Sequence, residues 1–275
     1  MGELASRNNE AARRSWLRAQ PRRLALAVTF LTSLPLRIGG EVTAAELWGS
    51  MGWYPLVGLA MGAAAWGIFA ALSWLLPPLV AAALVVLLLE AFTRGLHLDG
   101  LMDTCDGYFS GAPRERALEI MKDSRAGAMG VAGAVLVIVL KVAALGALTG
   151  ATAAAPLLAG WTAARVLPAL DVYLFRYARA AGTGEPFTRE RTPDVLVFAV
   201  VWLVAGAVWA GLQTGALGAG PGWAGLLIAA VALGVPLLLQ IVVARRLGGL
   251  TGDVYGMGIE LAETAALVTA CALLA

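Results

Sequence analysis

Three long stretches of this 275-residue chain carry almost no charge, and they limit the folds that the chain can adopt. Residues 51–89 and 195–244 contain no Asp, Glu, Lys or Arg over 39 and 50 positions, and residues 129–164 contain only Lys141. A helix needs about 20 apolar residues to cross a bilayer, so each stretch is long enough for two crossings. The alternating polarity of a membrane β-barrel is not visible in them. The chain is therefore predicted to be an all-α, polytopic helical membrane protein.

Each uncharged stretch contains a turn signal near its middle. Pro77 and Pro78 interrupt the first, residues 149–156 (TGATAAAP) the second and residues 214–222 (TGALGAGPG) the third. Three hairpins and a last segment from about 259 to 275 give roughly seven transmembrane helices. Arginines gather in the connections between the hairpins, which marks the cytoplasmic side. We expect a multi-pass protein of the cell (inner) membrane with its polar, catalytic loops on the cytoplasmic face.

The first 23 residues are polar and contain six arginines. They lack the apolar region of a signal peptide and are expected to form a basic cytoplasmic extension. Residues 24–275 are expected to form one integral-membrane domain. Its first apolar segment, residues 24–38, is short for a span and is expected to lie at the membrane interface or to be half inserted, with a full crossing as the alternative.

Four acids and the only histidine lie within residues 90–106, directly after the first uncharged stretch. Asp99, Asp103 and Asp106 are spaced i, i+4 and i+7, which places them on one face of a helix. Three adjacent carboxylates repel one another unless a cation lies between them, and oxygen ligands suit Mg²⁺, Mn²⁺ or Ca²⁺. A solvated acidic face, or ion pairs with nearby arginines, is the alternative explanation.

Two further polar segments suggest phosphate binding. Residues 122–125 (KDSR) precede an apolar stretch, and a lysine and an arginine beside an acid can clamp a phosphate. Anchoring at the cytoplasmic boundary explains Lys122 and Arg125 equally. The glycine-rich segment 245–258 contains Asp253, and the backbone amides of such a loop can wrap a phosphate.

These parts together fit metal-assisted phosphoryl transfer at a membrane surface. Walker A, kinase and nucleic-acid-binding signatures are absent from the sequence. Two alternatives remain open. A metal-coupled transporter needs polar groups along a path through the membrane, and the uncharged turns do not favour it. A lipid phosphoalcohol transferase has an acidic motif that begins like residues 103–107 (DTCDG), but the rest of that motif is missing.

Several segments, in the same order, resemble the signatures of the cobalamin synthase family, the adenosylcobinamide-GDP ribazoletransferases. The strongest likeness lies in residues 93–107 (TRGLHLDGLMDTCDG), 118–130 (LEIMKDSRAGAMG) and 248–256 (GGLTGDVYG). Residues 30–36 (FLTSLPL), 53–62 (WYPLVGLAMG) and 179–187 (RAAGTGEPF) are also similar to that family. The likeness extends from about residue 25 to the end, and the basic extension lies outside it.

The resemblance implies a polytopic transferase that uses Mg²⁺ and assembles the nucleotide loop of vitamin B12. The ribose 3′ hydroxyl of α-ribazole, or of its 5′-phosphate, would attack the phosphorus that carries the cobinamide of adenosylcobinamide-GDP, and GMP would leave. The expected partners are these substrates and the lipid bilayer. No nucleic acid is expected, and a homo-oligomer remains open.

The patterns and the resemblance together assign roles to residues. His97 is the one side chain with an ordinary pKa near neutrality and is expected to orient a phosphate or accept a proton. Glu90 is expected to matter because an unpaired acid at membrane depth is costly. The predicted catalytic residues are Asp103, Asp106, His97 and Asp123. The predicted substrate-binding residues are Lys122, Ser124, Arg125, Arg94 and Gly252. The predicted metal ligands are Asp99, Asp103, Asp106, Glu90 and Asp253.

Overall fold

The computed structural model describes residues 2–182, 184–189 and 191–274, with side chains from Trp16 onward. Apart from an isolated bridge between Tyr177 and Leu250, strand pairing does not occur in these residues, so the all-α prediction is confirmed. The helices are α1 (Gly2–Leu31), α2 (Ala44–Met51), α3 (Tyr54–Leu72), α4 (Pro78–Phe92), α5 (Leu96–Phe109), α6 (Arg114–Ile120), α7 (Ala128–Gly146), η1 (Pro156–Gly160), α8 (Trp161–Ala164), α9 (Leu167–Leu174), η2 (Glu185–Thr188), α10 (Pro193–Ala216), α11 (Ala224–Leu247) and α12 (Gly252–Leu274).

Six segments are long and apolar enough to cross a bilayer: α3, α7, the continuous run η1–α8–α9, α10, α11 and α12. Helices α4 and α5 meet the same criteria only as a pair bent by 88°, so the described residues contain six spans, or seven if this pair is one, in agreement with the roughly seven predicted. The breaks between helices fall at the predicted turns. Helices α4 and η1 each begin with a proline. The first N–H groups of a helix have no partner within it, so the N–H that proline lacks costs no hydrogen bond there.

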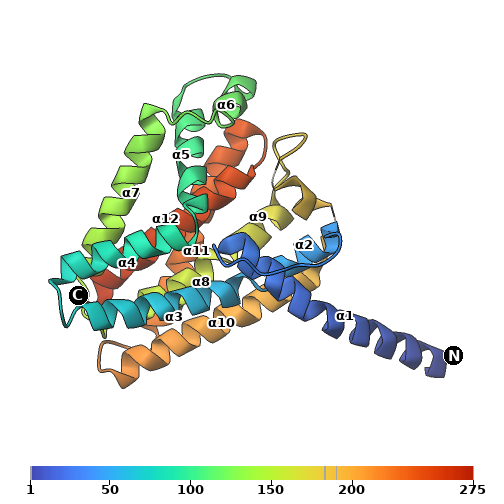
Figure 1. Ribbon diagram of the computed structural model, residues 1–275, viewed down its shortest axis with the longest axis horizontal. Coiled ribbons are helices and arrows are strands. Elements are labelled where there is room, and N and C mark those ends of the chain that lie inside the picture. The colour runs from blue at the N-terminus through green and yellow to red at the C-terminus, as the bar shows by residue number, and fades with distance from the viewer. Residues whose placement is uncertain (1, 183, 190, 275) are drawn as a thin grey trace.

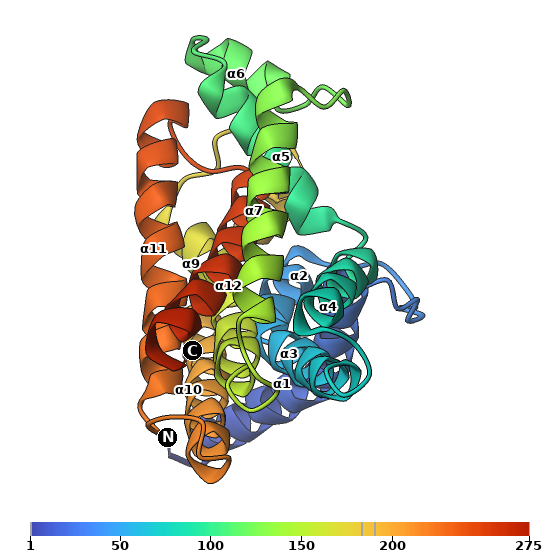
Figure 2. The ribbon, with the colours of Figure 1, turned by 90° about the vertical axis from the view of Figure 1, so that its left-hand side faces the viewer.

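A sharp corner separates α4 from α5. Arg94 and Gly95 both have left-handed backbone conformations, with φ of 59° and 64°, so the chain turns within residues 93–95. As a result α5 leaves the direction of α4 and lies beside α7 and α12 (Figures 1 and 2). The sequence did not predict this bend because Arg94 is not a residue type that favours positive φ.

Helix α1 runs without a break across residue 23, where the basic extension was expected to end. It projects from the helical body toward the N-terminus (Figure 1). Its apolar part spans only residues 24–31, and α1 is not among the segments able to cross a bilayer, which agrees with the prediction for this region.

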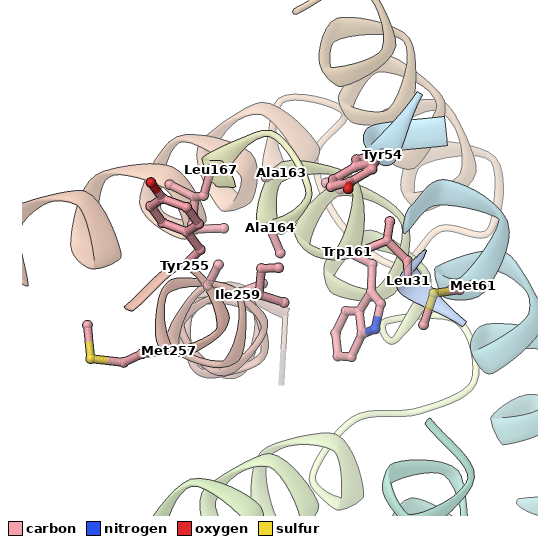
Figure 3. Close-up of a cluster of buried hydrophobic side chains, with 14 of the residues drawn as sticks. Leu31, Tyr54, Met61, Trp161, Ala163, Ala164, Leu167, Tyr255, Met257 and Ile259 are labelled. Atoms are coloured by element: carbon pink, nitrogen blue, oxygen red, sulfur yellow. The ribbon is translucent and has the colours of Figure 1, made fainter. Parts of the chain in front are cut away.

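The run η1–α8–α9 is the central span. Of its apolar window, 83% is buried inside the protein, against 33–56% for the other five spans. Trp161 of α8 is fully enclosed and lies between Met61 of α3 and Ile259 of α12 (Figure 3). Gly62 lets α3 approach closely here, because an added Cβ would lie 2.8 Å from the backbone carbonyl carbon of Leu157. Close backbone approach of this kind is what small residues provide in membrane helix packing.

A network of buried charges joins three of the helices. Lys141 Nζ of α7 donates hydrogen bonds to Glu260 (2.6 Å) and Glu263 (2.7 Å) of α12 and to Glu90 (3.3 Å) of α4. Arg165, at the end of α8, pairs with the other oxygen of Glu263. Each of these side chains is at most 14% exposed. Charges buried this deeply must be paired, so Lys141 determines how α4, α7 and α12 pack.

The two ends of the body differ in charge. The uncharged turns α3–α4, α7–η1 and α10–α11 gather at one end, near the C-terminus (Figure 1). The other end contains α6, the charged loop between α6 and α7, and the junction of α11 with α12, which is flanked by Arg245, Arg246 and Asp253 (Figures 1 and 2). Polar chemistry is therefore concentrated at one end of the helices.

We expect Gly62→Ala to lower the apparent Tm in detergent by roughly 4–10 °C, because the new methyl group meets the backbone of the central span. The matched control is Gly67→Ala on the same helix, where an added Cβ meets nothing within 4 Å. The control should leave Tm unchanged or raise it slightly, since alanine favours helix. Equal Tm values for both variants would contradict the close packing at Gly62.

We expect Lys141→Met to destabilise the protein by about 3–5 kcal/mol, because it leaves three carboxylates facing one guanidinium. Glu90→Gln should cost less than about 1 kcal/mol, because it leaves two carboxylates and two cations. Thermal unfolding in detergent measures both, with Lys122→Met, at an exposed position, as the control. A larger loss in Glu90→Gln than in Lys141→Met would contradict this account of the network.

Candidate active site

The acids predicted from the i, i+4, i+7 spacing all lie on α5, but they have different surroundings. Asp99 and Asp103 line a common cavity. Asp106 faces the start of α7, where its two carboxylate oxygens accept hydrogen bonds from the backbone N–H groups of Gly127 and Gly130, each at 2.7 Å. These are amides that a helix N-terminus leaves without an internal partner. Asp106 thus caps α7, and the structure separates it from the predicted metal site.

Helices α5 and α12 approach closely at Gly100, where an added Cβ would lie 2.6 Å from the backbone oxygen of Asp253. Asp253 stands in the first turn of α12, and Asp99 directly precedes Gly100. The missing side chain therefore lets Asp253 join Asp99 and Asp103 around one cavity. The prediction that Asp253 accompanies the α5 acids agrees with this geometry.

Arg179 is the site residue that the sequence did not single out. Its Nη2 lies 2.8 Å from Oδ2 of Asp253. The preceding residues are held to the loop before α12 by backbone hydrogen bonds from Ala178 N–H to Leu250 (2.8 Å) and from Leu250 N–H to Arg176 (2.9 Å). An arginine in a charged loop is an ordinary topology signal, so only the resemblance of residues 179–187 to the family pointed to it.

The cavity between these segments has a volume of about 480 Å³, and we call it the acidic cavity. It contains six of the predicted site residues together with Arg179. Its polar lining consists of Asp99, Asp103, Lys122, Asp123, Ser124, Arg179 and Asp253. These residues come from α5, from the loop between α6 and α7, from the loop after α9 and from the start of α12. The helices and loops that supply these residues meet at the charged end of the helices (Figure 1).

Asp123 and Arg125 form an exposed ion pair rather than a phosphate clamp. Arg125 Nε and Nη2 donate to the two carboxylate oxygens of Asp123 at 3.0 and 2.7 Å. These hydrogen bonds lower the pKa of Asp123 to about 2, so the carboxylate is ionised at physiological pH. Asp123 lines the acidic cavity, whereas the side chain of Arg125 is 87% exposed and does not. The structure does not bring Arg125 to the predicted substrate site.

His97 and Gly252 line a second cavity of about 240 Å³, and among the described residues this cavity shares Asp99 and Asp253 with the first. We call it the aromatic cavity, because Phe30, Tyr54, Phe187 and Tyr255 contribute to its wall. His97 is buried, and its Nε2 has no hydrogen-bond partner among the described residues. The predicted catalytic histidine therefore lies next to the acids but outside the acidic cavity.

Two predicted site residues lie elsewhere. Arg94 forms the corner between α4 and α5, and its guanidinium donates to the backbone oxygen of Thr29, at 3.4 Å. Glu90 belongs to the buried network around Lys141, and neither Glu90 nor Arg94 lines the acidic cavity. Glu90, Glu260 and Glu263 have oxygens within 4.8 Å of one another, but the ammonium group of Lys141 already takes the place of a metal ion among them. The structure therefore does not bring Glu90 to the aspartates, and its role as a metal ligand stays a prediction.

The acidic cavity provides the ligands that a divalent cation requires. Asp99, Asp103 and Asp253 form an all-oxygen set, which suits Mg²⁺. Four carboxylates line the cavity against two cations, Lys122 and Arg179. One of the four, Asp123, is paired with Arg125, which lies outside the cavity. Carboxylates that line one cavity repel one another, so a divalent cation would balance the site. The chemistry of these ligands suits Mg²⁺, although among the described residues the trio of acids whose oxygens lie within 4.8 Å of one another is Glu90, Glu260 and Glu263, so the cavity acids would have to draw together around the ion.

Comparison with known families matches nearly the whole chain. The profile of the family described as cobalamin-5-phosphate synthase matches residues 23–271, which leaves outside the basic N-terminal segment and the last four residues. Its range includes every residue of the acidic cavity. No solved structure gives a significant match.

Curated relatives cover the same range. A protein of Desulfitobacterium hafniense is 40% identical over 263 residues, which are 92% of this chain and 98% of that protein. Proteins of Pseudomonas aeruginosa and Desulforamulus reducens are 38% and 37% identical, over 92% and 88% of this chain and 98% and 92% of their own. All three bear the name adenosylcobinamide-GDP ribazoletransferase. With a matched profile and such relatives over most of its length, this chain belongs to the cobalamin-5-phosphate synthase family of transferases.

Proposed function

We propose that the protein transfers the phosphocobinamide group of adenosylcobinamide-GDP to α-ribazole, or to α-ribazole 5′-phosphate, with Mg²⁺ as cofactor. Its family is one of transferases of cobalamin synthesis, and the names of its relatives supply the substrates. One observation carries the proposal. Asp99, Asp103 and Asp253 surround a single open cavity with Arg179 and Lys122, as a diphosphate and a divalent cation require.

The proposed reaction is one displacement at phosphorus. The 3′-hydroxyl oxygen of the ribose forms a bond to the phosphorus that carries the cobinamide, and the bond from this phosphorus to the bridging oxygen of the diphosphate breaks. GMP leaves with the electron pair of that bond. The hydroxyl proton passes to a carboxylate of the acidic cavity, and no group is oxidised or reduced. The product is adenosylcobalamin or its 5′-phosphate.

The acidic and basic side chains of the acidic cavity would have different roles. Asp99, Asp103 and Asp253 would hold Mg²⁺, which when bound supplies positive charge to the phosphate oxygens. Arg179 and Lys122 would bind the diphosphate and the departing GMP, since guanidinium and ammonium groups form strong hydrogen bonds with phosphate oxygens. The arginine pair of Asp123 would hold the loop between α6 and α7 in place. The corrin ring, too large for a cavity of this volume, would remain outside it.

We further propose that the acidic cavity opens toward the cytoplasm. Residues 94–125, 176–194 and 245–253, which surround it, contain 21 of the 38 charged residues, and the turns at the other end of the helices contain none. Arginines and lysines in short loops favour the cytoplasmic side of a bilayer. This orientation gives the enzyme access to soluble nucleotide substrates.

Substitution of the cavity acids tests the reaction and the metal site together. We expect Asp103→Asn and Asp253→Asn to lower kcat/KM by roughly 100-fold or more, because each removes charge at the reacting phosphate. The assay follows GMP release and corrinoid product, in equal amounts, with purified protein in detergent, with Mg²⁺ or with EDTA. The control is Glu119→Gln, an exposed acid on α6 that does not line the cavity. Metal-independent turnover, or full activity in both variants, would contradict the proposal.

Arg179 should bind the diphosphate of the donor substrate, in addition to any contribution that its pairing with Asp253 makes to stability. We expect Arg179→Lys to raise the KM for adenosylcobinamide-GDP by about 10-fold and Arg179→Gln by more, since a charge-assisted hydrogen bond is worth roughly 1.5–3 kcal/mol. The KM for α-ribazole should change little. Arg176→Gln, three residues earlier at an exposed position, is the control. An unchanged KM for adenosylcobinamide-GDP in Arg179→Gln would show that Arg179 serves only to pair with Asp253.

A further inference from the structure

We propose that the aromatic cavity is the subsite that binds the benzimidazole base of α-ribazole. This inference rests on the proposed function and adds the place of the acceptor nucleoside to it. The cavity is separate from the acidic one, and Asp99 and Asp253 form the wall between them. A nucleoside with its base in the aromatic cavity would have its ribose at this wall and its 3′ hydroxyl at the acids.

The size of the cavity selects the group that it can hold. Its volume of about 240 Å³ lies below the roughly 300–1,000 Å³ usual for a whole drug-sized ligand. A fused bicyclic ring without its sugar fits such a space. A corrin ring does not. The choice is therefore between the base of α-ribazole and the guanine of the donor substrate.

The wall of the cavity favours a flat and largely apolar ring. Phe30 stacks on Tyr54, with ring centroids 5.9 Å apart and planes 13° from parallel, and meets Phe187 edge to face at 5.4 Å. Leu31 and Ile259 add aliphatic surface. Aromatic rings pack on other aromatic rings in these geometries. The methyl-bearing edge of the ribazole base matches this wall better than guanine, which has hydrogen-bonding groups on both of its edges.

Three buried polar atoms in the wall have no hydrogen-bond partner among the described residues: the hydroxyls of Tyr54 and Tyr255 and Nε2 of His97. Tyr54, Tyr255 and His97 are only 1%, 6% and 3% exposed. Tyr54 of α3 and Tyr255 of α12 approach this part of the core from different sides (Figure 3). A buried polar atom without a partner is costly, so a ligand that brings a hydrogen-bonding group to one of these atoms would relieve that cost. One tyrosine hydroxyl can donate to the free ring nitrogen of a benzimidazole.

Two variants of α12 test the subsite. Ile259→Phe fills part of the cavity and should raise the KM for α-ribazole by about 10-fold or more, as crowding of a hydrophobic pocket does. Tyr255→Phe keeps the ring, removes only a hydroxyl without a protein partner, and should raise that KM by about 3- to 10-fold. Both variants should leave the KM for adenosylcobinamide-GDP within about twofold of wild type, because the donor binds in the other cavity.

The controls are comparable substitutions outside the cavity, Leu261→Phe and Tyr173→Phe. Leu261 lies two residues beyond Ile259 on another face of α12, and Tyr173 is exposed. Neither should change the KM of either substrate. Equilibrium dialysis of α-ribazole alone, with wild type and with Tyr255→Phe, measures binding without turnover and should show the same loss. If Ile259→Phe does not fold, Tyr255→Phe alone tests whether the aromatic cavity binds α-ribazole.

The possible outcomes separate this inference from the proposed function. If wild type releases GMP and the variants raise only the KM for adenosylcobinamide-GDP, the cavity binds guanine and the inference is overturned. If wild type is active and the variants bind α-ribazole normally, the cavity is not a substrate site. If wild type shows no transfer, the proposed function fails, and the dialysis still shows whether the aromatic cavity binds α-ribazole.

Discussion

The structure depends on the pairing of one buried lysine. Lys141 lies in an apolar span and must find partners within the protein, because lipid provides none. It takes them from Glu90 of α4 and from Glu260 and Glu263 of α12. These contacts determine where α12 lies relative to α4 and α7. Since Asp253 belongs to the first turn of α12, the network also determines where this acid meets α5.

Separation of charge along the helices determines where chemistry is possible. One end of the body consists of uncharged turns, and the other contains α6 and the charged loops. Two cavities meet at the charged end, with Asp99 and Asp253 between them. The acidic one suits a diphosphate with its cation, and the aromatic one suits a base. A bimolecular transfer needs both substrates side by side, and the proposed use of these neighbouring cavities would bring them together.

Spacing alone placed the acids of α5 on one helix, but it did not distinguish their environments. Asp106 has the spacing of a metal ligand and caps α7 instead, because the first amides of that helix require an acceptor. Glu90 was grouped with the aspartates because it is near them in sequence, and the 88° corner after α4 separates them. Arg179 was missed because nothing local distinguishes it from other loop arginines; backbone hydrogen bonds to Leu250 bring it to the site.

The sequence by itself determined the class of fold, the number of spans, the positions of their turns and the end where chemistry gathers. These follow from local hydrophobicity, helical period and charge, which the membrane imposes on each segment separately. Only the tertiary structure decided which polar residues meet. The close approach at Gly100, the corner at Arg94 and the pairing of Lys141 are contacts between segments distant in the chain. Their geometry depends on how the helices pack against one another, and the sequence pattern of a single segment does not contain that information.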